Sequence, residues 1–410
     1  MSQDHRTLPN MMPPARRIGF RDILAPVRPE DFLANSFGRE ALYLPGPEKR
    51  FDGVFSWQRV TDLLNMSSLW SATTLKVVLD GRTVQPEEYC ITGQNRDGGT
   101  VAQPDPERVQ ALIRQGATIS LNLVETMIPE IAAIAAGLQC WFDGETVCNI
   151  YCSWGGHQGF QSHFDVHDVF VLQIDGTKSW NIYDGSFEET VNLEGYRSNS
   201  FPDSYHATAR GRVESKITMT PGDVLYIPRG RYHDALASSE ASLHMTFGID
   251  FMSGFHFLGA IADALLQDPF VWQPLPRFDR PDAHRAHMKK LAEHVHAYTL
   301  KPELARGIRA HQRQRAFAYC FPAYDLPTAT PKQVLRVRSL NTQLVRRGAN
   351  WRLEQPNGGA DLSDAEARLA DWLLPQDFIL ADEAESAFGD DLPVPTVLER
   401  FQSIGLLDAI

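Results

Sequence analysis

The residues around position 165 combine side chains that could bind a metal ion. His163 and Asp165 stand two positions apart, so both side chains project to the same face of an extended segment. His233 follows 70 residues after His163, behind the apolar stretch VLYI and a Pro-Arg-Gly turn. Two histidines and one carboxylate on a rigid β scaffold make the facial triad of non-haem Fe(II) oxygenases, which leaves open positions for a bidentate co-substrate and O₂.

Other residues compete for the same roles. His167 continues the alternation, so Asp165-x-His167 is a second candidate ligand pair, and a contact with substrate is the other role for His167. His244, in SLHMTF, is expected in the core or as a hydrogen-bond donor behind a ligand. Cys148-x-x-x-Cys152 has the form of a metal pair, but both cysteines lie in an apolar strand-like run, where buried free thiols are common.

Basic residues near these histidines have two interpretations. Lys178 is a lone lysine in the otherwise apolar stretch VFVLQIDGTKSWNIY, which indicates either a buried cation that awaits a carboxylate or a solvated edge lysine beside Asp175. Arg229 and Arg231 precede His233 at the rim of a possible cleft, where a solvated face is the default interpretation.

The elements that would position these residues are short strands. Turn signals such as Asp175-Gly176, Asp184-Gly185 and Pro221-Gly222 separate them, and this spacing indicates a sandwich or barrel, with the double-sheet jelly roll as the usual solution. The predicted strands are Thr146–Trp154, Val169–Ile174, Trp180–Tyr183, Lys216–Thr220, Val224–Ile227 and Leu243–Ile249.

Helical patterns flank the predicted strands. Residues from about 101 to 138 have helical spacing, opened by Pro106-Glu107. An apolar stripe from Phe257 to Leu266 predicts another helix, and Ser363-x-x-Glu366 is a capping box at the start of a third, within a last fifty residues that read as helical. Asn357-Gly358-Gly359 reads as a flexible connection.

Composition describes an ordinary globular chain. Of 410 residues, 43% are hydrophobic and 22% charged, and the net charge of −12 argues against a protein that coats nucleic acid. No apolar run approaches the ~20 residues of a membrane span, and the first residues lack the apolar block of a secretory signal. Five cysteines, with no CxxC pair, fit a reducing cytoplasm.

Charge is unevenly distributed along the chain. Residues 361–410 hold 12 acidic and 2 basic residues, whereas residues 271–320 hold 10 basic and 4 acidic ones together with five histidines. The acidic end argues against contact with DNA phosphates. It suits a basic partner or the basic segment of a second subunit, and a helical interface explains the histidines better than metal storage.

Three blocks of this chain, in this order, resemble the JmjC-type, cupin-fold 2-oxoglutarate oxygenases, and specifically their ribosomal oxygenase branch. The blocks are NIYCSWGGHQGFQSHFDVHDVFVLQIDGTKSW, PGDVLYIPRGRYHDA and SLHMTFGI. The resemblance implies an α+β fold with a double-stranded β-helix (jelly-roll) core. It implies four parts: a helical N-terminal flank that packs on the core (1–139), a catalytic core (140–252), a helical dimerisation segment (253–325) and a winged-helix-like C-terminal domain (326–410) that closes with VLERFQSIGLLDAI as a helix.

The resemblance also implies the site residues. His163, Asp165 and His233 would bind Fe(II), and Lys178 would pair with the distal carboxylate of 2-oxoglutarate. Asn149 and Tyr151 would hydrogen-bond the co-substrate. Two departures concern the substrate: the branch often has Thr-Pro where this chain has Ser153-Trp154, and the stretch Ser186–Val213 is long enough to border the substrate cleft.

The expected function is hydroxylation of an unactivated C–H bond with Fe(II), 2-oxoglutarate and O₂. A protein side chain is the favoured target, with a basic ribosomal protein as one candidate, and the enzyme is expected to be a cytoplasmic homodimer without a membrane partner. A free amino acid or a natural-product peptide is the alternative substrate. Two readings from other classes stay open: a non-catalytic metal-binding cupin module, and a three-histidine cupin enzyme in which His167 or His244 supplies a ligand.

Overall fold

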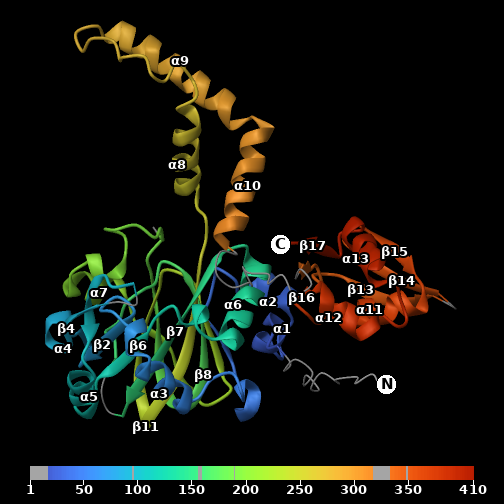
Figure 1. Cartoon of the computed structure of the whole chain (residues 1–410). Helices are drawn as coiled ribbons and strands as arrows, with labels where there is room; N and C mark the ends of the chain where they lie inside the picture. The colour runs from blue at the N-terminus through green and yellow to red at the C-terminus, as the bar shows by residue number, and fades with distance from the viewer. Residues whose placement is uncertain (1–16, 95–96, 156–158, 189, 317–332, 348–349) are drawn as a thin grey trace, which may run out of the picture.

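A single sheet forms the core that carries the candidate site (Figure 1). The computed structural model describes residues 17–410 except 95–96, 156–158, 189, 317–332 and 348–349. Among these residues, a nine-stranded sheet has the order β1-β10-β8-β11-β7-β6-β2-β3, with β9 paired to β8. Its strands are β1 (Leu42–Leu44), β2 (Leu75–Leu79), β3 (Arg82–Thr83), β6 (Thr118–Leu121), β7 (Glu145–Trp154), β8 (Asp168–Ser186), β9 (Val213–Met219), β10 (Val224–Ile227) and β11 (Arg231–Asp250).

Strand alternation divides this sheet into an apolar face and a polar face. In β7 the side chains of Cys148, Ile150 and Cys152 are fully buried in the main hydrophobic core, whereas Asn149 and Tyr151 line a cavity on the opposite side. This follows from the two-residue period of a strand. Because both cysteines face the apolar core, they do not form a metal pair.

Helices and a small hairpin cover the apolar face. Aromatic and aliphatic side chains from α1, α2 and α6 pack there against β7, β8, β10 and β11. The helices of this part are α1 (Phe20–Leu24), α2 (Pro29–Asn35), α3 (Trp57–Asn65), α4 (Pro86–Tyr89), α5 (Pro106–Arg114), α6 (Pro129–Phe142) and α7 (Asp203–Ala209). Four short 3₁₀ helices in the described chain are η1 (Glu48–Phe51), η2 (Ser67–Leu69), η3 (Val124–Thr126) and η4 (Ser198–Ser200), and the hairpin is β4 (Cys90–Gln94) with β5 (Thr100–Pro104).

Three sequence predictions for this part need correction. The N-terminal flank is not purely helical, because β1, β2, β3 and β6 belong to the nine-stranded sheet. The stretch 101–138 is not continuously helical, because Thr118–Leu121 forms β6 between α5 and α6 and pairs with both β2 and β7. Val169–Ile174 and Trp180–Tyr183 are not separate strands, because β8 runs through Asp175-Gly176 and Asp184-Gly185. At Asp175-Gly176 the pairing of β8 with β11 shifts in register, and the strand continues.

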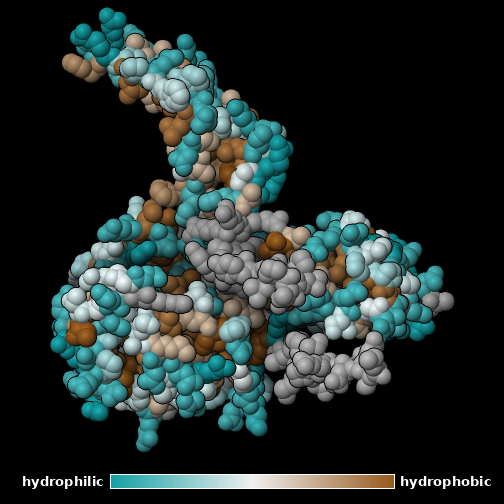
Figure 2. Space-filling view, in the orientation of Figure 1, coloured by the Kyte–Doolittle hydropathy of each residue, from teal (hydrophilic) through white to brown (hydrophobic). Residues whose placement is uncertain are grey.

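Three helices extend from the core as an arm (Figure 1). They are α8 (Gly254–Leu265), α9 (Pro281–Thr299) and α10 (Pro302–Ala316). The predicted stripe therefore forms a helix, yet only part of it is covered, because Ile261 and Leu265 are buried while Leu258 is 62% exposed. Apolar side chains reach the surface along this arm (Figure 2). Cys320 lies outside the described residues.

The C-terminal residues form a unit with its own core. This unit consists of β12 (Val334–Val337), β13 (Gln343–Arg347), β14 (Asn350–Gln355), β15 (Gly358–Leu362), α11 (Asp364–Leu373), β16 (Phe378–Leu380), α12 (Ala381–Phe388), α13 (Val394–Ser403) and β17 (Leu407–Ala409). The capping box at Ser363 and Glu366 is confirmed. Two expectations are wrong. Asn357-Gly358-Gly359 is not a flexible connection, because Pro356-Asn357 forms the turn of the β14–β15 hairpin and the two glycines begin β15. The closing helix ends at Ser403, after which the chain pairs with β12 as β17.

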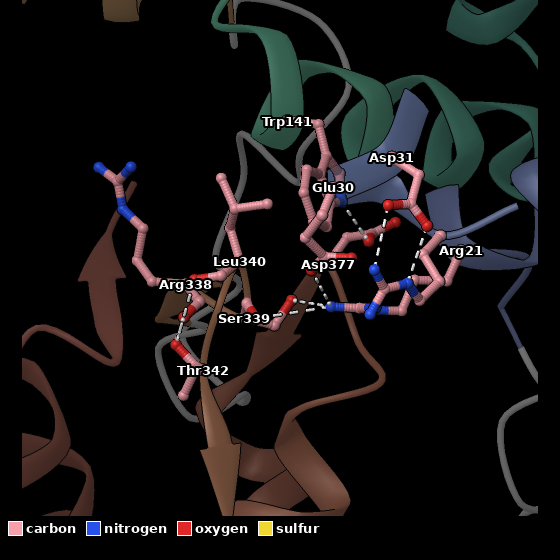
Figure 3. Close-up of polar contacts among 10 residues, drawn as sticks. Arg21, Glu30, Asp31, Trp141, Arg338, Ser339, Leu340, Thr342 and Asp377 are labelled. Atoms are coloured by element: carbon pink, nitrogen blue, oxygen red, sulfur yellow. Dashed lines mark hydrogen bonds and ion pairs between the residues drawn. The ribbon is translucent and has the colours of Figure 1, made fainter. Parts of the chain in front are cut away.

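A buried carboxylate joins the C-terminal unit to the N-terminal helices (Figure 3). Asp377 is 5% exposed and accepts hydrogen bonds from the Phe20 backbone N–H and the Trp141 Nε1–H, both at 2.7 Å. Burial raises the pKa of Asp377. Gly137 permits this approach, since a Cβ there would lie 2.5 Å from an Asp377 oxygen. Arg17 adds an ion pair to Glu383 at 2.6 Å.

No helix in the described part of the chain is both long and apolar enough to span a membrane.

Asp377→Asn should loosen this junction. An amide oxygen replaces only one of the two acceptors, so the Phe20 N–H or the Trp141 N–H loses its partner, and the free energy of unfolding should fall by about 1–3 kcal/mol. Denaturant unfolding followed by circular dichroism measures the change. Asp371→Asn, on the exposed face of α11, is the control, and equal stability of the two variants would contradict the assigned role.

Candidate metal and co-substrate site

A backbone pair between His163 and His233 organises the candidate metal site. His163 lies just before β8, and His233 lies near the start of β11. Each donates its backbone N–H to the carbonyl of the other, at 3.0 and 2.9 Å. This pairing holds the two imidazole rings with their centroids 4.5 Å apart.

Asp165 joins the histidines because of a glycine turn. The Gly230 N–H donates to the Asp165 carbonyl at 2.7 Å. Gly230 has φ +83°, and a Cβ there would lie 2.2 Å from the Phe187 carbonyl oxygen, so the position requires glycine. The turn brings an Asp165 carboxylate oxygen to 3.5 Å from His233 Nε2.

The three side chains form a compact donor set. One ligand atom from each of His163, Asp165 and His233 lies within 4.8 Å of the others, and among the described residues this is the one group with such geometry. Both histidine Nδ1 atoms are occupied by backbone carbonyls, those of Gln161 at 2.8 Å and Arg231 at 3.0 Å. With Nδ1 as donor, each Nε2 lone pair is free for a metal, as is usual for metal-binding histidines.

Electrostatics also suit a cation. Burial acts to raise the pKa of Asp165, but His167, His163 and His233 outweigh it and bring that pKa below its ordinary value. Burial, followed by the neighbouring His163, lowers the pKa of His233 to about 4. A carboxylate and a neutral imidazole are the forms that bind divalent iron.

His167 lines the same cavity but is not part of the donor set. Its ring packs against Gly248, where a Cβ would come within 3.1 Å of the imidazole, and its Nδ1 is buried without a hydrogen-bond partner among the described residues. The side chain of Phe164, between the two candidate ligands, points the other way and stacks on Phe187. Side chains therefore alternate between two faces along residues 163–165, as the sequence predicts.

Lys178 is a buried cation rather than a solvated edge lysine. Its side chain lies on the cavity floor, 4% exposed, and Nζ donates to Ser153 Oγ at 3.0 Å. Thr118 Oγ1 donates to the same oxygen at 3.1 Å. Ser153 therefore positions the lysine. Burial lowers the pKa of Lys178 to about 7, so a bound carboxylate would restore its charge.

Asn149 and Tyr151 lie on the same floor. Tyr151 stacks on His244 with ring centroids 4.9 Å apart, and Ser120 and Asn149 hydrogen-bond with its side chain. Burial raises the pKa of Tyr151 to about 12, so the phenol stays protonated. Burial lowers the pKa of His244 well below its ordinary value, and the neutral ring forms part of the cavity wall.

The cavity has a volume of about 1460 Å³ and includes residues that sequence reasoning missed. The expectation that Ser186–Val213 borders it is confirmed, through η4 and α7. Arg229 and Arg231 do not line it, because they pair with Asp168 and Glu214. The missed lining residues are Lys76 and Arg82 on β2 and β3, Thr118 and Ser120 on β6, and Arg197 and Arg210. In the sequence, their basic or polar type is the one signal that could have indicated a place in the cavity lining.

Comparison with known families gives the class of this fold and site. Residues 123–256 match the model of the JmjC domain. This part of the chain is therefore similar to JmjC domains, and the structure has the α+β fold that its motifs predict.

The chain is also similar to ribosomal oxygenases. It is 28% identical to ribosomal oxygenase 2 of Bos taurus over 275 residues, which cover 60% of this chain and 53% of the relative. It is 26% identical to the bifunctional lysine-specific demethylase and histidyl-hydroxylase NO66 of Drosophila willistoni over 233 residues, which cover 55% of this chain and 28% of the relative. The chain thus spans about half or less of the length of these curated relatives.

A solved structure of the Escherichia coli ribosomal oxygenase YcfD, in complex with cobalt and 2-oxoglutarate, is also similar. It has a TM-score of 0.49 and 19% sequence identity, and the match covers 92% of this chain and 97% of that chain.

Lys178→Met should stabilise the protein in the absence of co-substrate. The folded-state pKa of about 7 lies below the ordinary 10.5, so the unfolded state binds more protons between these values. The cost of burying Lys178 is thus largest at and below pH 7 and is lost as the pH rises toward 10.5. At pH 7 the variant should gain roughly 1–3 kcal/mol in the free energy of unfolding.

Denaturant unfolding at pH 7 and at about pH 9.5 measures this difference. Lys216→Met, on the exposed side of β9, is the matched control. A Lys178→Met protein that is less stable than the wild type at pH 7 would show that the lysine already has an anionic partner.

Proposed function

We propose that this chain is an Fe(II)- and 2-oxoglutarate-dependent oxygenase that hydroxylates an unactivated C–H bond on a protein side chain. The observation that carries the proposal is the pairing of two features in one cavity. The compact set of His163, Asp165 and His233 has the donor types of the iron facial triad. Lys178 is a buried cation on the floor of the same cavity, without a carboxylate partner among the described residues.

The residues divide the chemistry between them. His163, Asp165 and His233 would hold the iron, with the ring orientations fixed by the backbone carbonyls of Gln161 and Arg231. Bound iron with 2-oxoglutarate supplies the oxidation that inserts one oxygen atom of O₂ into a C–H bond while the co-substrate is decarboxylated.

Lys178 would hold the distal carboxylate of the co-substrate, with Ser153 setting the position of its ammonium group. Asn149 and the protonated Tyr151 would orient the co-substrate through hydrogen bonds. The buried aromatic ring of Trp180 helps to keep water from this part of the cavity.

A ribosomal protein is the first target to search, since the similar curated proteins include ribosomal oxygenases. A free amino acid or a natural-product peptide is the alternative substrate. We also propose a cytoplasmic location, because the described cysteines are buried free thiols.

Anaerobic titration of the full chain with Fe(II), followed by 2-oxoglutarate, tests the chemistry. A visible metal-to-ligand charge-transfer band should form in the wild type. It should be absent in His163→Ala, and Lys178→Ala should need much more 2-oxoglutarate to form it. His167→Ala is the matched control, because His167 lines the cavity outside the donor set, and its band should persist.

Two outcomes would overturn this assignment. No band in folded wild-type protein would favour a non-catalytic metal-binding cupin module. A band lost in His167→Ala but kept in His163→Ala would move the ligand pair to Asp165 and His167.

We propose that residues 253–325 dimerise the protein. The arm exposes large apolar side chains that a monomer would leave in water, including Trp272 at 68% and Phe278 at 91% exposure. The acidic residues 361–410 would then dock a basic partner or the basic arm of the second subunit.

Sedimentation velocity of the full chain should show a dimer of the 46.0 kDa subunit. The double variant Trp272→Ser/Phe278→Ser should dissociate at least about tenfold more readily, because buried aromatic anchors dominate most interfaces. Met66→Ser/Ile91→Ser, at exposed apolar positions outside the arm, is the matched control and should leave the dimer unchanged. A monomeric wild type, or an unchanged double variant, would contradict the proposal.

A further inference from the structure

Residues 192–210 form an ordered wall of the cavity. Buried His206 uses both ring nitrogens, which lie 2.9 Å from the Tyr232 hydroxyl and 3.0 Å from the Ser198 carbonyl. At the end of the wall, the Gly185 N–H of β8 donates to the Arg210 carbonyl at 3.0 Å. A Cβ on Gly185 would lie within 2.5 Å of the Arg210 backbone. The backbone of Arg210 is therefore fixed against the strand that carries Lys178.

The side chain of Arg210 is fixed as well. Its Nη1 donates to Ser162 Oγ at 3.0 Å, and the guanidinium lies over the Tyr183 ring at 5.3 Å. The Tyr183 hydroxyl in turn donates to Asp234 Oδ2 at 2.5 Å. Ser162 and Asp234 are the chain neighbours of the two candidate histidine ligands. The guanidinium is thus held beside the site where oxidation is proposed.

This half-buried cation has no anionic partner among the described residues. Asp234 is engaged by Tyr183 and Asn181, and Asp184 binds Arg212 at 3.6 Å. A guanidinium has five N–H donors, and the contacts above use one of them. A partly desolvated charge without a counterion costs free energy that an incoming anion recovers.

The rest of the cavity mouth has the same sign of charge. Lys76, Arg82 and Arg197 line it together with Arg210, and no ion pair in the described chain involves any of these four. Once Asp165 is assigned to iron, Asp203 is the remaining carboxylate of the lining. A basic cleft in a chain of net charge −12 concentrates anionic ligands at its entrance.

We infer that Arg210 is a specificity-determining residue that binds a carboxylate of the target segment, so that the hydroxylated residue lies next to Asp or Glu in its protein. This inference rests on the proposed function, which makes the ligand a polypeptide. The planar guanidinium fork matches a carboxylate in a way that a point charge does not. Lys76, Arg82 and Arg197 attract the same segment. The requirement concerns only the residues that enter the cavity, so the target as a whole can still be basic.

Binding of labelled peptide pools to the full chain tests this inference. Three fluorescein-labelled nonapeptide pools have a randomised central residue with flanks of Asp/Glu, Asn/Gln or Lys/Arg. They are titrated by anisotropy under anaerobic conditions with Fe(II) and 2-oxoglutarate, where no turnover occurs. The acidic pool should bind about tenfold more tightly than the amide pool, as a charge-assisted hydrogen bond predicts. Arg210→Gln should remove most of that preference.

Two variants separate recognition from structure. Arg212→Gln removes a basic side chain that is 94% exposed and paired with Asp184, and it should keep the preference. Arg210→Lys keeps the charge and should retain a weaker preference. Equal losses in Arg210→Lys and Arg210→Gln would assign a structural role and overturn the inference.

The pools themselves can also overturn it. Amide or basic pools that bind as well as the acidic pool would do so, as would a single-stranded DNA oligonucleotide that binds more tightly than the acidic pool. The charge-transfer band of each variant is recorded in parallel. A normal band without peptide preference therefore refutes only the role of Arg210, whereas a missing band refutes the proposed function.

Discussion

The backbone pair between His163 and His233 is the constraint on which the site depends. It joins the segment before β8 to the start of β11 at the end of the sheet, and the Gly230 turn fixes where that pairing begins. Because side chains alternate along a strand, a slip of the segment before β8 by one residue would turn His163 and Asp165 toward the aromatic cluster that holds Phe164. The pairing register therefore decides which chemistry the cavity contains.

The cavity floor collects polar groups at a cost to stability. Lys178 and His244 are both buried, and burial shifts the pKa of each toward the neutral form. The opposite face of β11 offsets part of this cost, since Leu243 and Met245, the chain neighbours of His244, are fully enclosed by the main core. Strand β11 thus serves stability with one set of residues and the site with the other.

The sequence predicted most of what depends on local periodicity. The convergence of His163 and Asp165 follows from their two-residue spacing, whereas the apolar neighbours of Lys178 left its burial as one of two interpretations. Contacts between segments that lie far apart in the chain could not be predicted from the sequence. β6 has four residues inside a helical pattern, and only its pairing with β2 and β7 makes it a strand. The position of Arg210 depends on Gly185 and Ser162, which no spacing rule connects to it. In the C-terminal unit, tertiary pairing likewise made Leu407–Ala409 a strand where local pattern favoured helix.

The Asp377 junction has a consequence for the order in which the molecule is completed during synthesis. The Phe20 N–H at the start of α1 and its acceptor lie 357 residues apart in the chain, and chains emerge from the ribosome N-terminus first. The Phe20 N–H and the Trp141 indole N–H therefore have no Asp377 acceptor until nearly the whole chain has been synthesised. The sheet can form earlier, since its strands end at Asp250. The attachment of the C-terminal unit is thus a late step that closes a surface left incomplete on an already folded core.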